Sequence, residues 1–137
     1  MQDKKIFILN EGLIELGESS FANNISLKSI NLPDSLKTIK SNAFSNCYNL
    51  TNVKTSKNTQ LIKIYNCAFE NTQIEELKIN RSAQILFEPL SVPKLNKISF
   101  YQGEPINFIQ SKDGTIYRKL DNDIIDNQIL TKYHFIT

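Results

Sequence analysis

The chain is poor in the residue types on which most catalytic sites depend. Its 137 residues include one histidine, four glycines and no tryptophan. A Ser-His-Asp or Cys-His arrangement would have to use His134, and a single histidine near a chain end is usually incidental. The four glycines are isolated from one another, so no glycine-rich phosphate loop is present. The sequence therefore predicts a protein that is not an enzyme and that uses no cofactor.

The charge balance and the short apolar runs exclude two further classes. The 16 basic and 14 acidic residues give a net charge of +2, and no run of like charges occurs, so we expect no nucleic-acid partner. No apolar stretch approaches the length of a membrane span. The stretch Ile6–Leu9 is too short for the apolar region of a signal peptide. Either the protein stays in the cytoplasm, or the chain is an excised or non-classically exported piece.

A repeated apolar pattern is what the sequence has in place of a catalytic motif. The pattern restarts at Leu27, Leu50, Ile74 and Leu95, which lie 23, 24 and 21 residues apart. A period in the twenties predicts a solenoid, in which each repeat is one turn of the coil. One such unit cannot bury its apolar face alone. Stacking the units closes a continuous core and pairs their strands edge to edge.

Each unit begins with a short expected strand. The alternation of Ile30 and Leu32 places both side chains on the inner face, and Lys28, Ser29 and Asn31 would face water. The following Leu36-x-x-Ile39 segment would return along the opposite wall.

A phenylalanine recurs after the second segment, and an asparagine follows it by two residues. The phenylalanines are Phe21, Phe44 and Phe69, and the asparagines are Asn23, Asn46 and Asn71. We predict that the three rings stack as a ladder. Because asparagine tolerates left-handed backbone conformations, the asparagines are predicted to end the turns. Chance in an asparagine-rich chain is the alternative.

The segment Leu27-x-x-Ile30-x-Leu32-Pro33-x-x-Leu36-x-x-Ile39-x-x-x-Ala43-Phe44-x-x-Cys47-x-x-Leu50 resembles the BspA-like, or Treponema pallidum-type, leucine-rich repeat. The resemblance is sharpest here and degenerate at 74–95, where Pro89-Leu90 replaces Ala-Phe. It implies a β-rich α/β solenoid of about four units with 23-residue repeats over residues 1–100, the first and last incomplete. It also implies adhesion, or binding of a host or matrix protein, at a microbial cell surface or after secretion.

The period fails after residue 100, and turn signals take its place. Ile106–Ile109 and Thr115–Arg118 flank Asp113-Gly114, which is a strong hairpin signal, and Ile124-Ile125 reads as a third strand. We therefore divide the chain into a solenoid at 1–100 and a hairpin or capping segment at 101–137. The segment Ser111–Tyr117 resembles the hairpin that interrupts many BspA-like arrays.

No metal site is expected from the cysteines or the carboxylates. Cys47 and Cys67 occupy different phases of the repeat, so both are predicted to be small buried residues, not a disulfide or zinc ligands. Asp121-Asn122-Asp123 lacks the glycine and glutamate of a calcium-binding loop and is predicted to be a turn. The sequons at Asn24, Asn49 and Asn80 matter only if a eukaryote secretes the protein.

The outward positions of the expected strands line up in columns, and these form the candidate protein-binding face. It consists of Lys28, Ser29, Asn31, Asn52, Lys54, Glu76, Lys78, Lys97 and Ser99. Stacked strands with varied polar side chains are a common binding surface of repeat proteins, although these residues are equally consistent with an ordinary solvated sheet. The face as predicted has no aromatic residue, which argues against tight binding.

Two functions follow from this pattern. The first is a protein–protein recognition module that acts through the strand face. The alternative is an intracellular structural scaffold or self-assembling unit without catalytic activity, stacked end to end through its open ends.

Overall fold

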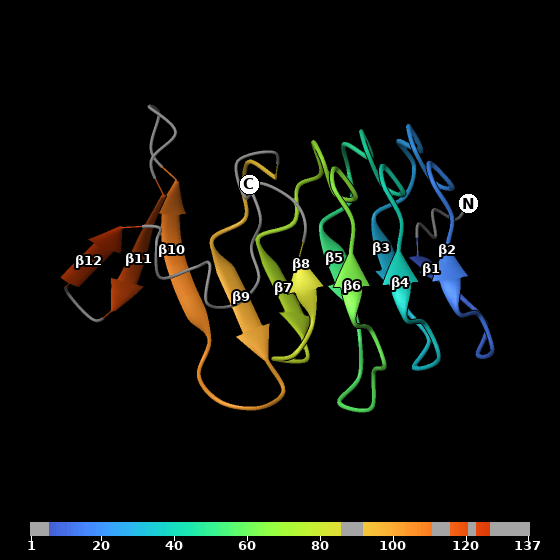
Figure 1. Ribbon diagram of the computed structural model, residues 1–137. Helices are drawn as coiled ribbons and strands as arrows, with labels where there is room; N and C mark the ends of the chain where they lie inside the picture. Colours follow the sequence, from blue (N-terminus) through green and yellow to red (C-terminus); the bar gives the residue numbers. More distant parts are fainter. Residues whose placement is uncertain (1–5, 86–91, 111–115, 121–122, 127–137) are drawn as a thin grey trace.

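The computed structural model describes residues 6–85, 92–110, 116–120 and 123–126, and these residues form a β-solenoid of about four turns. Two rows of short strands run along the solenoid on opposite sides of the core (Figure 1). The first row contains β1 (Ile6–Ile8), β3 (Ser29–Asn31), β5 (Asn52–Lys54), β7 (Glu76–Ile79) and β9 (Lys97–Phe100). The second row contains β2 (Glu15–Leu16), β4 (Thr38–Ile39), β6 (Lys63–Ile64) and β8 (Gln84–Ile85).

The described residues contain no helix, so the α/β part of the predicted fold class is wrong. In the first three turns, the segment that leaves the second strand holds two left-handed residues four positions apart, such as Asn42 (φ 60°) and Asn46 (φ 62°). A right-handed helix cannot pass through left-handed residues. The chain instead makes successive tight turns, as in the hydrogen bond from the Ser45 N–H to the Asn42 carbonyl at 3.1 Å.

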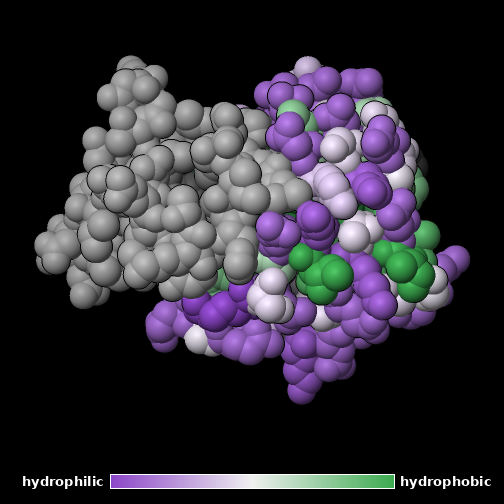
Figure 2. Space-filling view, viewed as in Figure 1, coloured by the Kyte–Doolittle hydropathy of each residue, from purple (hydrophilic) through white to green (hydrophobic). Residues whose placement is uncertain are grey.

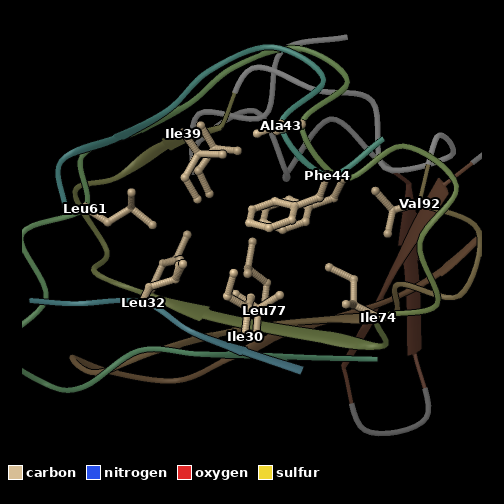
Figure 3. Close-up of a cluster of buried hydrophobic side chains, with 14 of the residues drawn as sticks. Ile30, Leu32, Ile39, Ala43, Phe44, Leu61, Ile74, Leu77 and Val92 are labelled. Carbon is tan, nitrogen blue, oxygen red and sulfur yellow. The ribbon is translucent and has the colours of Figure 1, made fainter. Parts of the chain in front are cut away.

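The core is a continuous column of aliphatic side chains contributed by every turn. Figure 3 shows the ring of Phe44 pointing to the middle of this core, toward which Ile30 and Leu77 also point from the first row of strands. Ile39 faces them from the opposite wall. These four residues are almost completely buried. The alternation predicted from the sequence is therefore confirmed.

The predicted phenylalanine ladder is present. The ring centroids of Phe21 and Phe44 are 5.4 Å apart and those of Phe44 and Phe69 are 5.2 Å apart, with interplanar angles of 9° and 5°. Phe7 in β1 adds a tilted ring at 5.6 Å from Phe21. Phe21 and Phe44 are also fixed through their backbones, since their N–H groups donate to the Ala43 and Ala68 carbonyls of the next turn, both at 2.8 Å. Stacked rings and main-chain bonds thus hold the turns at one spacing.

The asparagines predicted to end the turns are left-handed, which confirms the prediction. Their φ angles are 66° at Asn23, 62° at Asn46 and 59° at Asn71. Their side chains also form a ladder that the sequence did not reveal: the Asn46 amide donates to Asn23 at 3.1 Å, and the Asn71 amide donates to Asn46 at 2.9 Å. One residue type therefore serves both the backbone conformation and the contact between turns.

The two cysteines differ in their surroundings, and the prediction holds for one of them. Cys47 is fully buried, and its thiol donates to the Phe21 carbonyl at 3.0 Å. Cys67 is half-buried and left-handed, with a φ of 61°. Ser19 and Asn42 are left-handed at the same place, two residues before their phenylalanine. Cys67 therefore belongs to the turn and not to the core, which corrects the expectation of a second buried cysteine.

The chain beyond β9 turns from parallel to antiparallel pairing. β10 (Ile106–Gln110) pairs with β9 and with β11 (Ile116–Leu120), and β11 pairs with β12 (Asp123–Asp126). The predicted hairpin strands are therefore confirmed. Asp113-Gly114, Asp121-Asn122 and the tail with His134 lie outside the described residues.

Candidate protein-binding face

The nine residues of the candidate protein-binding face fall into three groups of exposure. Five are exposed: Lys28, Asn52, Lys54, Glu76 and Lys78. Asn31 and Lys97 are half-buried, and Ser29 and Ser99 are buried at 8% exposure each. The expectation that Ser29 and Ser99 face water is therefore wrong. Larger neighbours cover these short side chains: Ser29 lies in register between Ile6 and Asn52, and the Ser99 hydroxyl hydrogen-bonds the Glu76 carboxylate.

The predicted columns form within two separate sheets and not across the whole solenoid. Asn31 lies in register with Lys54, and Lys78 lies in register with Ser99. However, β1, β3 and β5 form one hydrogen-bonded sheet, and β7 belongs to the sheet that continues through β9. β5 and β7 are still neighbours in the stack. The candidate protein-binding face is therefore divided between β5, which carries Lys54, and β7, which carries Lys78.

A shorter connection explains this division. Six positions separate Phe21 from Leu27 and Phe44 from Leu50, but five separate Phe69 from Ile74. The segment that leads into β7 therefore arrives one residue early relative to the turn before it.

The hydrogen bonds around the strands show the consequence of the missing residue. Between β3 and β5 the Thr51 N–H donates to the equivalent Lys28 carbonyl at 3.0 Å, and between β7 and β9 the Asn96 N–H donates to the equivalent Glu75 carbonyl at 3.0 Å. Between β5 and β7 the donor is instead Gln73, which bonds Leu50 at 2.8 Å. The hydrogen bonds between the two strands thus begin at non-equivalent positions, and no regular ladder forms.

A groove of about 420 Å³ lies over this division. Its walls come from both strands and from the residue that follows β9. They are formed by Thr51, Asn52, Val53, Lys54, Thr55, Gln73, Glu75, Glu76, Lys78 and Tyr101. Four of the predicted face residues, Asn52, Lys54, Glu76 and Lys78, therefore meet in one concave site.

Backbone groups contribute to the floor of the groove. The Lys54 carbonyl accepts a hydrogen bond from Leu32 at 2.9 Å, so the backbone of Lys54 points toward β3. Neighbouring residues of a strand turn their backbone groups to opposite edges, so the backbone of Val53 points toward β7. The Val53 side chain is buried in the core, and it is accordingly the main chain of Val53 that lines the groove.

Tyr101 closes one end of the groove, and the sequence prediction missed it. The Thr55 hydroxyl donates to the Lys78 carbonyl at 2.8 Å, and the Tyr101 hydroxyl lies 2.7 Å from Thr55. Because the single Thr55 proton is already used, Tyr101 is the donor. The statement that the face has no aromatic residue is therefore corrected. The signal was its position: Tyr101 continues the outward alternation of Lys97 and Ser99.

Arg81 holds Tyr101 in place through the turn that follows β9. Its Nε donates to the Gln102 carbonyl at 2.9 Å and its Nη2 donates to the Glu104 carbonyl at 2.7 Å. The guanidinium also lies 4.1 Å from the centroid of the Phe100 ring. Between them, Gly103 has a φ of 91°, and a Cβ at this position would lie 2.9 Å from Arg81 Nη2. The turn thus requires glycine for both its conformation and its contact.

Charges of opposite sign occupy the two ends of the groove. Glu75 and Glu76 lie at the start of β7, and Lys54 and Lys78 lie at the ends of the two parallel strands. The Lys78 ammonium lies 4.6 Å from the centroid of Tyr101, within the range of a cation–π contact. The groove is therefore acidic at one end, and basic at the end that Tyr101 closes.

A family comparison agrees with this repeat geometry. A family model described as a BspA type leucine rich repeat region of six copies matches residues 2–90. The chain belongs to the BspA-type leucine-rich repeat family. No curated protein sequence matches the chain significantly.

Three solved structures share the fold of this chain. A leucine-rich repeat protein from Bacteroides ovatus matches with a TM-score of 0.60 and 27% identity, over 69% of this chain and 25% of that one. A leucine rich cell surface protein from Faecalibacterium prausnitzii (TM-score 0.52, 16% identity) is covered over 34% of its length by 80% of this chain. A leucine-rich repeat protein from Eubacterium ventriosum matches with a TM-score of 0.53 and 15% identity, over 84% of this chain and 36% of that one. The chain thus spans about a quarter to a third of these proteins.

The side of this BspA-type solenoid opposite the candidate protein-binding face carries β2, β4, β6 and β8. Figure 2 shows it to be mostly hydrophilic over the coloured part, with separate hydrophobic spots. Exposed Ile14 and Ile62 flank Lys37 there, and the Lys40 and Lys63 ammonium groups lie 4.5 and 5.1 Å from the Tyr65 ring. Scattered exposed apolar residues of this kind are ordinary on a protein surface. The described residues hold no helix that is long and apolar enough to cross a membrane.

Proposed function

We propose that this chain is a protein–protein recognition module that binds its partner through the candidate protein-binding face. The observation that carries the proposal is the groove between β5 and β7, in which four face residues meet beside Tyr101. Aromatic residues in concave, partly apolar settings dominate many protein interfaces. Leucine-rich repeat proteins are typically interaction modules and typically non-catalytic, so the proposal includes no reaction.

The partner of this module is a host or extracellular-matrix protein, which the chain meets at a microbial cell surface or after secretion. The name of the Faecalibacterium prausnitzii neighbour, a cell surface protein, supports this location. Residues 101–137 would act as the capping segment of the solenoid. β10 supports this role because it covers the edge of β9 that a further turn would otherwise use.

A charge reversal tests the proposed face. Binding of the chain to immobilised extracellular-matrix proteins, including collagen and laminin, is measured by surface plasmon resonance for wild type and Lys54→Glu/Lys78→Glu. We expect affinity for a bound matrix protein to fall at least about tenfold, because both reversed charges lie in one groove. Lys37→Glu/Lys40→Glu is the matched control, since it changes the same charge on the opposite side. Equal affinity of the two double variants would refute the face.

The exposed apolar residues of the first turn favour self-assembly as a second candidate function. Ile6, Phe7 and Ile8 in β1 are 53%, 44% and 72% exposed, and β1 pairs with β3 along one edge. Among the described residues β1 pairs with β3 alone, and an edge strand with apolar side chains is a template for pairing with another chain. Sedimentation at rising concentration tests this function: a mass that stays monomeric contradicts it, and a mass that rises for wild type but not for Ile8→Lys supports it.

A further inference from the structure

The groove between β5 and β7 has the features of a site for an extended peptide segment. Its lining follows β5 from Thr51 to Thr55 and β7 from Glu75 to Lys78, and it includes the Val53 backbone and charges of opposite sign. The groove is bracketed by two hydrogen bonds between the turns, from Gln73 to Leu50 and from Thr55 to Lys78. The chain is therefore joined at both ends of the groove and open between them.

We propose that the groove binds an extended polypeptide segment that carries a basic and an acidic residue two positions apart. This inference rests on the proposed function and adds the chemistry of the partner. The basic residue of the segment pairs with Glu75 and Glu76, and its acidic residue pairs with Lys54 and Lys78 at the Tyr101 end. Main-chain groups of the segment bond to the edge at Val53.

The spacing of the charges supports this choice of partner. Glu76 and Lys78 are two residues apart on one strand, which places their side chains on the same face at a separation of about 6.6–6.8 Å. An extended segment of the form Lys-x-Glu has the same separation between its own charges. A uniformly charged segment would instead place one of its charges against a like charge in the groove, which lowers affinity.

Rigid walls favour a preformed site over one that closes around its ligand. Thr55 and Tyr101 fix the closed end, and the Arg81 contacts with Gln102 and Glu104 hold the turn from which Tyr101 projects. The walls of the groove are therefore already ordered in the folded chain, so binding costs less conformational entropy. Arg81 is by this reasoning a positioning residue for Tyr101.

Nuclear magnetic resonance titration with three capped hexapeptides tests the inference. The peptides share Ser and Thr flanks and differ at the centre, which is Lys-Thr-Glu, Lys-Thr-Lys or Glu-Thr-Glu. We expect the Lys-Thr-Glu peptide to bind at least about fivefold more tightly than the others, with shifts concentrated at Val53, Thr55 and Lys78. Equal affinity of the three peptides, or shifts centred elsewhere, would overturn the inference.

Charge-swapped variants make the test reciprocal. Lys54→Glu/Lys78→Glu leaves an acidic groove and should prefer the Lys-Thr-Lys peptide, and Glu75→Lys/Glu76→Lys leaves a basic groove and should prefer Glu-Thr-Glu. The amide spectrum of each variant outside the groove serves as the folding control. If neither variant changes preference, the peptide inference fails.

The failure of this inference is distinguishable from failure of the proposed function. If the peptides do not bind but Lys54→Glu/Lys78→Glu still weakens binding to a matrix protein, the face is correct and the peptide chemistry is wrong. If that variant binds matrix proteins like its control and the peptides do not bind, both are wrong.

Discussion

The junction between β3 and β5 and the junction between β5 and β7 are built from similar residues and differ in outcome. In the first, strands pair residue for residue, from Ser29 with Asn52 to Asn31 with Lys54. In the second, the strands lie side by side without a ladder. The connection that leads into β7 is one residue shorter than the connection that leads into β5. A connection shorter by one residue thus accompanies the change from a regular sheet contact to a polar groove.

The two junctions also differ in what stabilises them. At the regular junction, the stacked rings of Phe44 and Phe69 and the bond between Asn46 and Asn71 reinforce the strand ladder. At the divided junction, side-chain bonds of Thr55 and Tyr101 replace part of the ladder. Repeat proteins are stabilised by contacts between neighbouring turns, so the regular part supplies rigidity that the groove can use.

The largest expected effect comes from the regular part. Phe44→Ala removes the middle ring of the ladder from a fully buried position and should lower the free energy of unfolding by about 3–5 kcal/mol. Urea denaturation followed by circular dichroism measures the change. Tyr48→Ala is the control, because Tyr48 is half exposed and lies outside the ladder, and it should change stability by less than about 1 kcal/mol. Equal losses would contradict the ladder.

The asparagine ladder should contribute less than the rings. Asn46→Ala removes a residue suited to its left-handed φ of 62° and the side-chain bonds to Asn23 and Asn71, so we expect a loss of about 1–3 kcal/mol. Asn46→Gly restores the backbone freedom without the bonds and should recover part of that loss in the same urea assay. Asn58→Ala, in an exposed turn, should be nearly neutral. If Asn46→Gly is no more stable than Asn46→Ala, the left-handed conformation at this position does not contribute to the effect on stability.

The contact of Arg81 with the turn that positions Tyr101 can be tested separately from the strain of a left-handed backbone. Gly103→Ala and Gly12→Ala both place a side chain at a left-handed φ and should each cost about 1–2 kcal/mol. The Gly103 variant also brings a Cβ to 2.9 Å from Arg81, whereas nothing lies within 4 Å of a Cβ at Gly12. We therefore expect Gly103→Ala to lower the melting temperature more. Identical melting temperatures would show that Arg81 does not hold this turn.

The smallest effect concerns the thiols. Burial raises the pKa of the Cys47 thiol, so the folded chain keeps this proton at a pH where the unfolded chain has lost it. Stability should consequently fall as the pH rises above the ordinary thiol pKa of about 8.5, and Cys47→Ala should remove this component of the loss. Thermal melts between pH 7.5 and 10 check the sign. A wild type and variant with parallel pH profiles would contradict it.

The regular part of the fold was predictable from the sequence because its determinants repeat. Leu27 to Leu50 holds every inward residue of one turn, and the phenylalanine and asparagine offsets recur in the turns on either side. Local pattern and global packing agree there, which is the condition under which sequence reasoning succeeds. The helical part of the expected fold class failed because paired left-handed residues, including Ser19 and Cys67, interrupt this connection in the first three turns.

The groove was less accessible to sequence reasoning because it depends on contacts between distant residues. Four of its lining residues were predicted as face residues from their outward alternation. Tyr101 was missed because it lies just beyond the last repeated position, and Arg81, which positions it, belongs to the preceding turn. The burial of Ser99 under Glu76 likewise depends on a diagonal side-chain contact between strands. No periodicity encodes these contacts.

Amide hydrogen exchange at two positions tests most directly the claim that the strand ladder is open between β5 and β7. The Leu32 N–H is bonded to the Lys54 carbonyl at the regular junction, and the Val53 N–H faces the divided one. We predict that Val53 exchanges much faster than Leu32 in the free chain. Equal protection of the two amides would mean that β5 and β7 pair as β3 and β5 do, and it would contradict both the groove and the binding site proposed in it.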